Sequence, residues 1–151
     1  MDIFDKKTDV LEQIKKEHEK FRDLIKQIEE ASGSSKKSIF ETLKMDVSAH
    51  HKAEEAVVFP DVKSKSDEDG QEIVREMIEE HNLSTYQMSL LDRTSVDNET
   101  WDAKFAVLKE VLTHHMDEEE KELFKQAKKV LTKDELAQKY GPFEKKEESA
   151  K

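Results

Sequence analysis

The stretch HHKAEEAVVFP, residues 50–60, decides the fold because it places two histidines and two glutamates directly before an apolar run. Almost the same arrangement returns as HHMDEEEKELF, residues 114–124. In each copy a histidine and a glutamate are four residues apart, so on a helix they share one face with about 5 to 6 Å between their Cβ atoms. Each copy can therefore present an imidazole and a carboxylate to one cation. The residues are His50 with Glu54 and His115 with Glu119.

Apolar periodicity predicts four long helices. Side chains that repeat every three or four residues mark segments of about 9–31, 36–59, 70–92 and 101–130, and Pro60 is expected to end the second of them. Three glycines, two prolines and 41% charged residues favour helices over sheets. Because the predicted loops are short, we predict an all-α fold, an up-down-up-down antiparallel four-helix bundle.

The C-terminal segment is expected to lie outside the bundle. The stretch TKDELAQKYGP, residues 132–142, predicts a capped short helix that Gly141 and Pro142 close. The charged residues that follow are expected to be disordered. The predicted organisation is one bundle over residues 1–131, with a short helix and a charged tail over residues 132–151.

Composition disfavours several classes of function. A chain of 151 residues with 34% hydrophobic content suits one modest domain. The formal net charge of −10 disfavours nucleic acid and anionic membranes as partners, since both would repel the protein. Without cysteine there is no disulfide, no thiolate metal ligand and no cysteine nucleophile. No segment has the apolar length of a signal peptide or a membrane span, so we expect a cytoplasmic protein, whose oligomeric state the sequence leaves open.

Polar residues interrupt the predicted apolar stripes, where an unpaired charge is costly. His18 stands in the first stripe and His81 in the third. Antiparallel packing of neighbouring helices brings both histidines to the level of the two repeated motifs. We therefore predict that six side chains converge as metal ligands: His18, His50, Glu54, His81, His115 and Glu119.

The donor types restrict the metal. Imidazole and carboxylate donors without sulfur suit iron, manganese or zinc, and two carboxylates suffice to bridge a pair of ions. The competing interpretation, buried histidines that only hydrogen-bond in the core, would leave the buried carboxylates in need of other partners. His51 and His114 point about 100° away from the site on ideal helices, so we expect them to be helix-contact or surface residues. Glu118 and Glu120 are expected to form a solvated face.

The two motifs resemble those of the hemerythrin family, specifically its HHE cation-binding domains, whose second and fourth helices carry HxxxE before an apolar and aromatic end. The resemblance spans about residues 8–130. It implies a non-haem di-iron site, with manganese or zinc as less favoured metals. The implied site has two bridging carboxylates and four terminal histidines: Glu54 and Glu119, then His18, His50, His81 and His115.

The resemblance also implies a small ligand such as dioxygen, peroxide or nitric oxide. The oxygen carriers of the family have a fifth histidine four residues after the first on the third helix, where this chain has Thr85. The site is therefore expected to be more open than theirs. Three functions stay open: a protein that binds or senses such a ligand or iron, a catalase-like or peroxidase-like enzyme that breaks down hydrogen peroxide, and a structural metal site.

Overall fold

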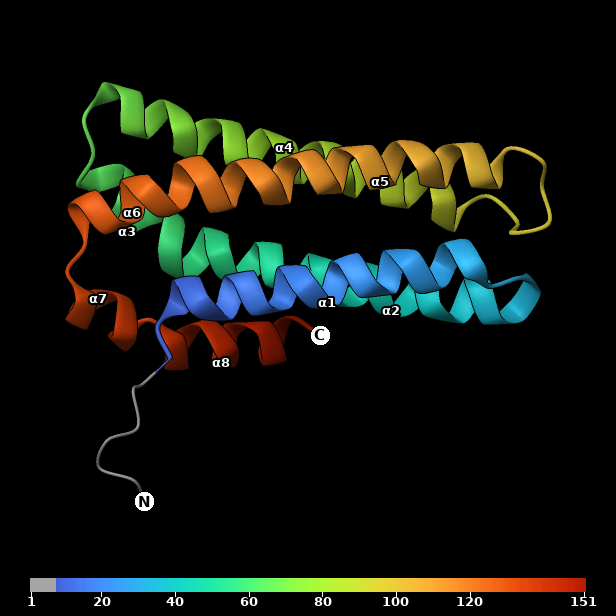
Figure 1. The fold of residues 1–151 in the computed structure, drawn as a ribbon, viewed down its shortest axis with the longest axis horizontal. Helices are drawn as coiled ribbons and strands as arrows, with labels where there is room; N and C mark the ends of the chain where they lie inside the picture. The colour runs from blue at the N-terminus through green and yellow to red at the C-terminus, as the bar shows by residue number, and fades with distance from the viewer. Residues whose placement is uncertain (1–7) are drawn as a thin grey trace, which may run out of the picture.

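Two antiparallel helical hairpins make up most of the molecule. The computed structural model describes residues 8–151, and Figure 1 shows their long helices running along one axis. In the first hairpin, α1 (Val10–Glu30) packs against one continuous helical segment: α2 (Gly33–Ala53), η1 (Glu54–Val58) and α3 (Phe59–Ser64). In the second, α4 (Glu68–Asp92) packs against α5 (Trp101–Glu118), η2 (Glu119–Leu123) and α6 (Phe124–Val130). The predicted all-α class is confirmed, and no strand occurs between residues 8 and 151.

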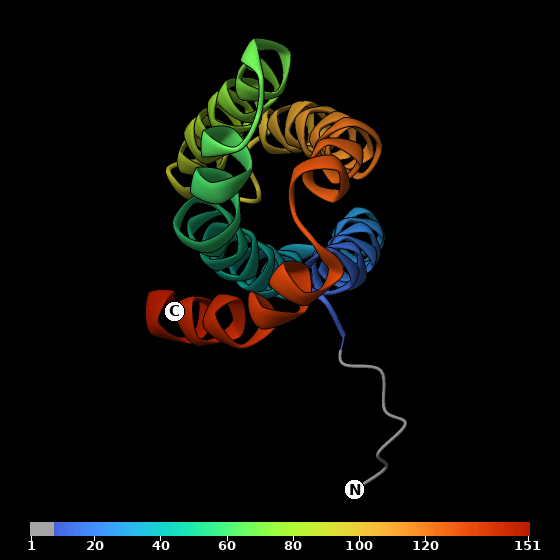
Figure 2. The same ribbon diagram turned by 90° about the vertical axis from the view of Figure 1, so that its left-hand side faces the viewer.

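The C-terminal segment differs from the prediction. After α7 (Lys133–Gln138), α8 (Tyr140–Ala150) packs along α2 on the outside of the first hairpin (Figure 2). The expected disordered tail is therefore wrong, because the fully buried ring of Phe143 anchors this segment on the core. Gly141 and Pro142 do not close a helix but lie in the first turn of α8, where proline needs no intrahelical N–H donor. The molecule is thus more than a plain four-helix bundle.

Side-chain caps define where the helices begin. Asp9 accepts a hydrogen bond from the backbone N–H of Glu12, and the Glu12 side chain accepts one from the N–H of Asp9. This capping box satisfies two of the N–H groups that a helix start leaves without partners. Thr132 and Glu135 repeat the arrangement before α7, and Asp67 accepts from the N–H of Gly70 before α4.

One π-helical turn interrupts the second helix of each hairpin, η1 in the first and η2 in the second. The N–H of Phe59 donates to the carbonyl of Glu54, and the N–H of Phe124 donates to that of Glu119. The helix continues through Pro60, contrary to the prediction, because this proline lies in the first turn after η1. A proline does not cause these turns, since η2 has none. What they share is a buried glutamate as first residue, and π turns are frequent at functional sites.

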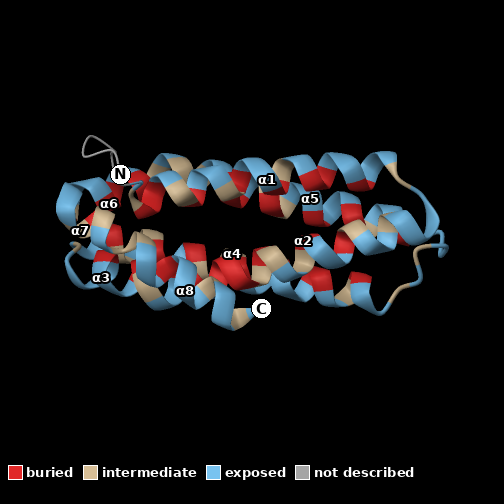
Figure 3. Cartoon of the chain, turned by 90° about the horizontal axis from the view of Figure 1, so that it is seen from below, coloured by how far each residue is buried: buried red, intermediate tan, exposed pale blue. Residues whose placement is uncertain are grey.

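The interior consists of two apolar clusters with a polar layer between them. One cluster, around Phe59 and Phe143, fills the end where α3, α6 and α7 lie. The other, around Trp101 and Phe105, fills the opposite end. Figure 3 shows buried residues along the full length of the helices, and the predicted metal ligands lie in the layer between the clusters. Over residues 8–151 no helix combines the length and apolar character needed to cross a membrane.

Two glycines provide a matched test of the packing at the start of α4. A Cβ atom on Gly70 would lie 2.3 Å from Nε2 of Gln126 and 2.6 Å from Cβ of Ser66, whereas nothing lies within 4 Å of such an atom on Gly141. We expect Gly70→Ala to lower the free energy of unfolding by about 1 to 3 kcal/mol, because these neighbours must move. Gly141→Ala should leave it unchanged or raise it by up to about 1 kcal/mol, since alanine favours the helix. Urea denaturation measures both values, and equal stability of the two variants would contradict the close approach.

Candidate metal centre

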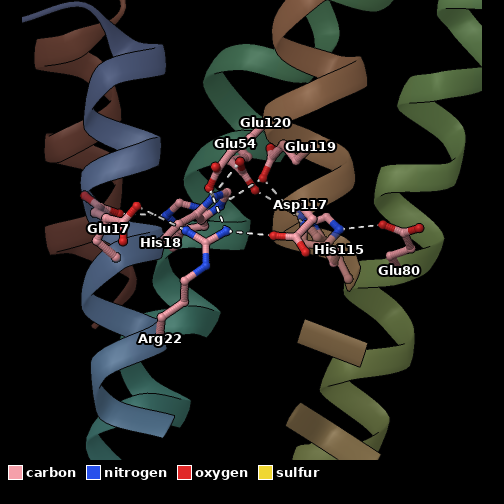
Figure 4. Close-up of polar contacts among 12 residues, drawn as sticks. Glu17, His18, Arg22, Glu54, Glu80, His115, Asp117, Glu119 and Glu120 are labelled. Atoms are coloured by element: carbon pink, nitrogen blue, oxygen red, sulfur yellow. Dashed lines mark hydrogen bonds and ion pairs between the residues drawn. The ribbon is translucent and has the colours of Figure 1, made fainter. Parts of the chain in front are cut away.

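The structure brings the six residues predicted as ligands together in the polar layer. Each is at most 2% exposed, and Figure 4 shows several of them directed at a common centre between the hairpins. Two imidazole–carboxylate contacts among these six residues cross from one hairpin to the other. Nε2 of His18 lies 3.1 Å from Oε1 of Glu119, and Nε2 of His81 lies 3.0 Å from Oε1 of Glu54. The two glutamates are therefore shared between the hairpins.

Each glutamate also faces the histidine one helical turn before it. Nε2 of His50 lies 3.4 Å from Oε2 of Glu54, and Nε2 of His115 lies 3.6 Å from Oε1 of Glu119. The spacing of four residues thus produces the shared face that the sequence predicted. Every one of the four histidines consequently turns Nε2 toward the centre.

The opposite ring nitrogen of each histidine donates to a second glutamate. Such an outer carboxylate fixes the tautomer and the ring orientation of a metal-binding histidine. The four bonds are 2.6 to 2.7 Å long, and they join His18 to Glu120, His50 to Glu17, His81 to Glu55 and His115 to Glu80. The sequence did not predict these partners. Their signal is a repeat, because a glutamate precedes the first histidine and follows the predicted ligand glutamate in both halves.

Nine buried side-chain atoms over residues 8–151 have no hydrogen-bond partner, and all belong to this layer. Leaving so many polar atoms unpaired in an apolar interior is costly, whereas lone pairs directed at one centre are what a cation requires. The residues present therefore fit a metal site. The atoms are Nε2 of His18, His50, His81 and His115, Nδ1 of His51, and both carboxylate oxygens of Glu54 and Glu119.

The orientation of His51 differs from the prediction. This residue does not point away from the site, because its ring stacks on that of His81 with 3.6 Å between centroids, and the side chain is buried. Adjacent residues on a helix are about 100° apart, so His50 and His51 lie on either side of the direction to the core and both reach it. His114 is 67% exposed, as expected, and pairs with Glu80 and Glu118.

Two further expectations need correction. Glu120 is not part of a solvated face, since it accepts the Nδ1 proton of His18 and also pairs with Arg22 at 3.0 Å. Glu118 does lie at the surface beside His114. Thr85 is exposed on α4 and therefore does not mark an open position at the centre. The extra imidazole comes instead from His51.

The donor atoms form two sets. In each set, one atom from every residue lies within 4.8 Å of the others, and Glu54 belongs to both sets. Two cations could therefore bind side by side with a carboxylate between them. One set comprises His51, Glu54, His81 and His115, and the other comprises His18, His50, Glu54 and Glu119.

Burial and the neighbouring charges set the protonation of the layer. Burial, with the carboxylate of Glu119 beside it, raises the pKa of Glu54 well above its usual range. Burial opposes ionisation of Glu119 as well, but contacts with Glu54 and His18 outweigh it and hold the pKa of Glu119 well below its usual range. The two carboxyl groups thus keep one proton in the absence of metal. Burial lowers the pKa of His51, which is therefore neutral and able to donate a lone pair.

Comparison with known proteins agrees with this site. The sequence model of the family described as the hemerythrin HHE cation binding domain matches residues 9–127. The chain belongs to this family. A protein of Mycobacterium kansasii, the Rv2633c homologue described as hemerythrin HHE cation binding domain-containing, shares the fold of this HHE domain with a TM-score of 0.81. The two are 22% identical over 95% of this chain and 87% of the other, so the likeness concerns the fold. No curated protein matches the sequence significantly.

The two histidines outside the predicted ligand set give a matched pair of variants for the HHE site. We expect His51→Ala to weaken metal binding by at least about tenfold, because it removes one imidazole from the donor set around His81. His114→Ala should leave the affinity unchanged, since that side chain faces solvent. Competition with a chelator of known affinity measures both. Equal affinity of His51→Ala and the parent protein would show that His51 is not a ligand.

Metal affinity should depend on pH, because the pKa values of Glu54, His18 and His81 are all raised in the metal-free protein. A raised pKa means that the folded metal-free protein holds the proton more tightly, and this contribution to stability is lost as the pH rises through the raised pKa. A cation must displace the proton, so the affinity should rise about tenfold per pH unit for each proton released. Chelator competition between pH 6 and 8 tests the slope. An affinity that does not change over this range would contradict the assignment of the proton.

Proposed function

We propose that this HHE domain holds two iron ions and binds or reacts with a small oxygen-related molecule, namely dioxygen, peroxide or nitric oxide. The observation that supports this most strongly is that nine buried atoms without hydrogen-bond partners surround two donor sets that share Glu54. A hydrogen-bonded core would not leave these atoms without partners. A pair of cations could take four donors from each set.

Iron is the metal that fits the donors and the proposed chemistry. Imidazole and carboxylate donors suit iron, manganese and zinc, but zinc in structural sites is usually closed by four ligands and has no redox chemistry. Bound iron supplies electron transfer and coordination positions for a small ligand. A purely structural ion would account for the stability of the layer, but not for two sets with unequal donors.

The chain itself orients the donors and keeps the site dry. The four outer glutamates hold the imidazoles with Nε2 inward, so the donor geometry exists before a cation arrives. The apolar clusters on both sides exclude water, which strengthens electrostatic interactions within the layer. Any bound molecule must therefore be small.

The second candidate function is breakdown of hydrogen peroxide, and the inequality of the donor sets favours it. His51 lies three residues before Glu54, and the equivalent position before Glu119 is occupied by the buried Met116. The set around His81 therefore has three imidazoles, and the set around His18 has two. Both sets have four donor residues, but the His18 set has one imidazole fewer and one carboxylate more, so we assign the reacting ligand to the His18 side.

Metal content and stability test the first part of the proposal. Freshly purified, iron-supplied protein should contain close to two metal ions per chain, and metal should raise the melting temperature. Free metal at about a thousand times its dissociation constant would add about 4 kcal/mol to the free energy of unfolding. One ion per chain, or identical melting of metal-free and loaded protein, would contradict a dinuclear site.

Met116 provides a test of the reacting side. Met116→His should add a donor to the His18 set and slow the consumption of peroxide by about tenfold, equal to about 1.4 kcal/mol in the barrier. Met116→Leu keeps the volume without adding a donor and should react like the parent. Oxygen evolution from peroxide is the measurement. A parent that releases dioxygen reversibly and does not consume peroxide would support a binding protein and exclude the enzyme.

A further inference from the structure

The two halves of the repeated site are not covered equally. His50 and His115 hold equivalent places, and each donates Nδ1–H to a glutamate from the first helix of its own hairpin, Glu17 or Glu80. Beyond Glu80 lies the surface, where Nε2 of the exposed His114 is 3.6 Å from Oε2 of Glu80. Beyond Glu17 lies α8, which has no counterpart on the second hairpin among residues 8–151.

Two side chains of α8 reach the surroundings of His50. The carboxyl group of Glu147 lies beside that of Glu17, with ligand atoms of Glu17, His50 and Glu147 all within 4.8 Å of one another, and Oε2 of Glu147 lies 4.0 Å from Nδ1 of His50. The ring of Phe143 meets the imidazole of His50 edge to face, with 5.8 Å between centroids and an interplanar angle of 84°. One contact thus fixes the partner of His50, and the other fixes the plane of its ring.

A third contact ties the start of α8 to the π turn. Lys139 donates from Nζ to the backbone carbonyl of Val57 at 3.0 Å and also pairs with Asp61. Val57 belongs to η1, the turn that begins at Glu54. The segment from Lys139 to Glu147 therefore contacts the helix of His50 both at His50 and beyond Glu54. All of it lies outside residues 9–127, the part that the family model matches.

We propose that α8 is a positioning element for His50 and slows the release of metal from the set that contains His18 and His50. This inference rests on the proposed metal site. Glu147 acts through Glu17, which holds Nδ1–H of His50 and so directs Nε2 to the metal. Phe143 prevents rotation of the imidazole by packing against it. The set around His115 has no such cover and exchanges its ion faster.

Zinc serves as a redox-inert probe of this inference, with release to a colorimetric chelator as the measurement on the full-length chain. Glu147→Ala should release one of the two ions about tenfold faster, since loss of an outer partner typically weakens metal binding by 10- to 100-fold. Glu147→Gln should keep the parent rate, because the amide has the same size and can donate to Glu17. Glu148→Ala, a change at the exposed neighbouring residue, is the control and should have no effect.

A second readout distinguishes positioning from a general loss of stability. In the zinc-loaded protein the Nδ1–H proton of His50 should give a downfield proton resonance, and Glu147→Ala should speed its exchange with water. Phe143→Leu should also speed release from the same set, and it serves as a second variant if Glu147→Ala does not fold. Parent-like release in both variants, or equal acceleration of both ions, would overturn the inference while leaving the metal site intact. A parent that binds no zinc and no iron would overturn the proposed function itself.

Discussion

The structure depends on two buried carboxylates that reach across the interface between the hairpins. Glu54 faces His81, and Glu119 faces His18, so the buried carboxyl group of each hairpin lies against an imidazole of the other. A hairpin on its own would present an ionised carboxylate on its apolar face, and such an unpaired charge is strongly destabilising in an interior. Packing is most extensive within each hairpin. The polar layer therefore makes the association of the two hairpins specific in register and depth.

Two of the four outer glutamates also connect the hairpins. Glu17 and Glu80 serve the histidine of the neighbouring helix in their own hairpin, whereas Glu55 and Glu120 serve a histidine of the opposite hairpin. The list of donors and partners is thus completed only when both hairpins are docked. Because neither hairpin alone contains a complete donor set, we expect metal binding to favour docking of the hairpins.

The repeated motif was predictable because it depends on helical periodicity alone. The spacing from His50 to Glu54 places both on one face in any helix, with or without the π turn that begins at Glu54. His51 was not predictable by the same rule, since a core-facing stripe on a helix can be wider than one residue and adjacent positions can both contact the core. The outer glutamates were hidden because 36 acidic residues make any single one resemble a solvated surface residue. The C-terminal helix α8 is anchored on the core by the buried ring of Phe143, and no periodic apolar pattern in this segment predicts that contact.

Departures from the repeat make the two donor sets different. An exact repeat would give both sets the same donors. Here His51 adds an imidazole to one set, while Met116 stands at the equivalent place in the other half. The helix α8 covers the other set, because it packs over His50. Near His115 the corresponding surface carries the exposed His114. The set with fewer imidazoles is therefore the one in which His50 is packed against α8 as well as bonded to Glu17.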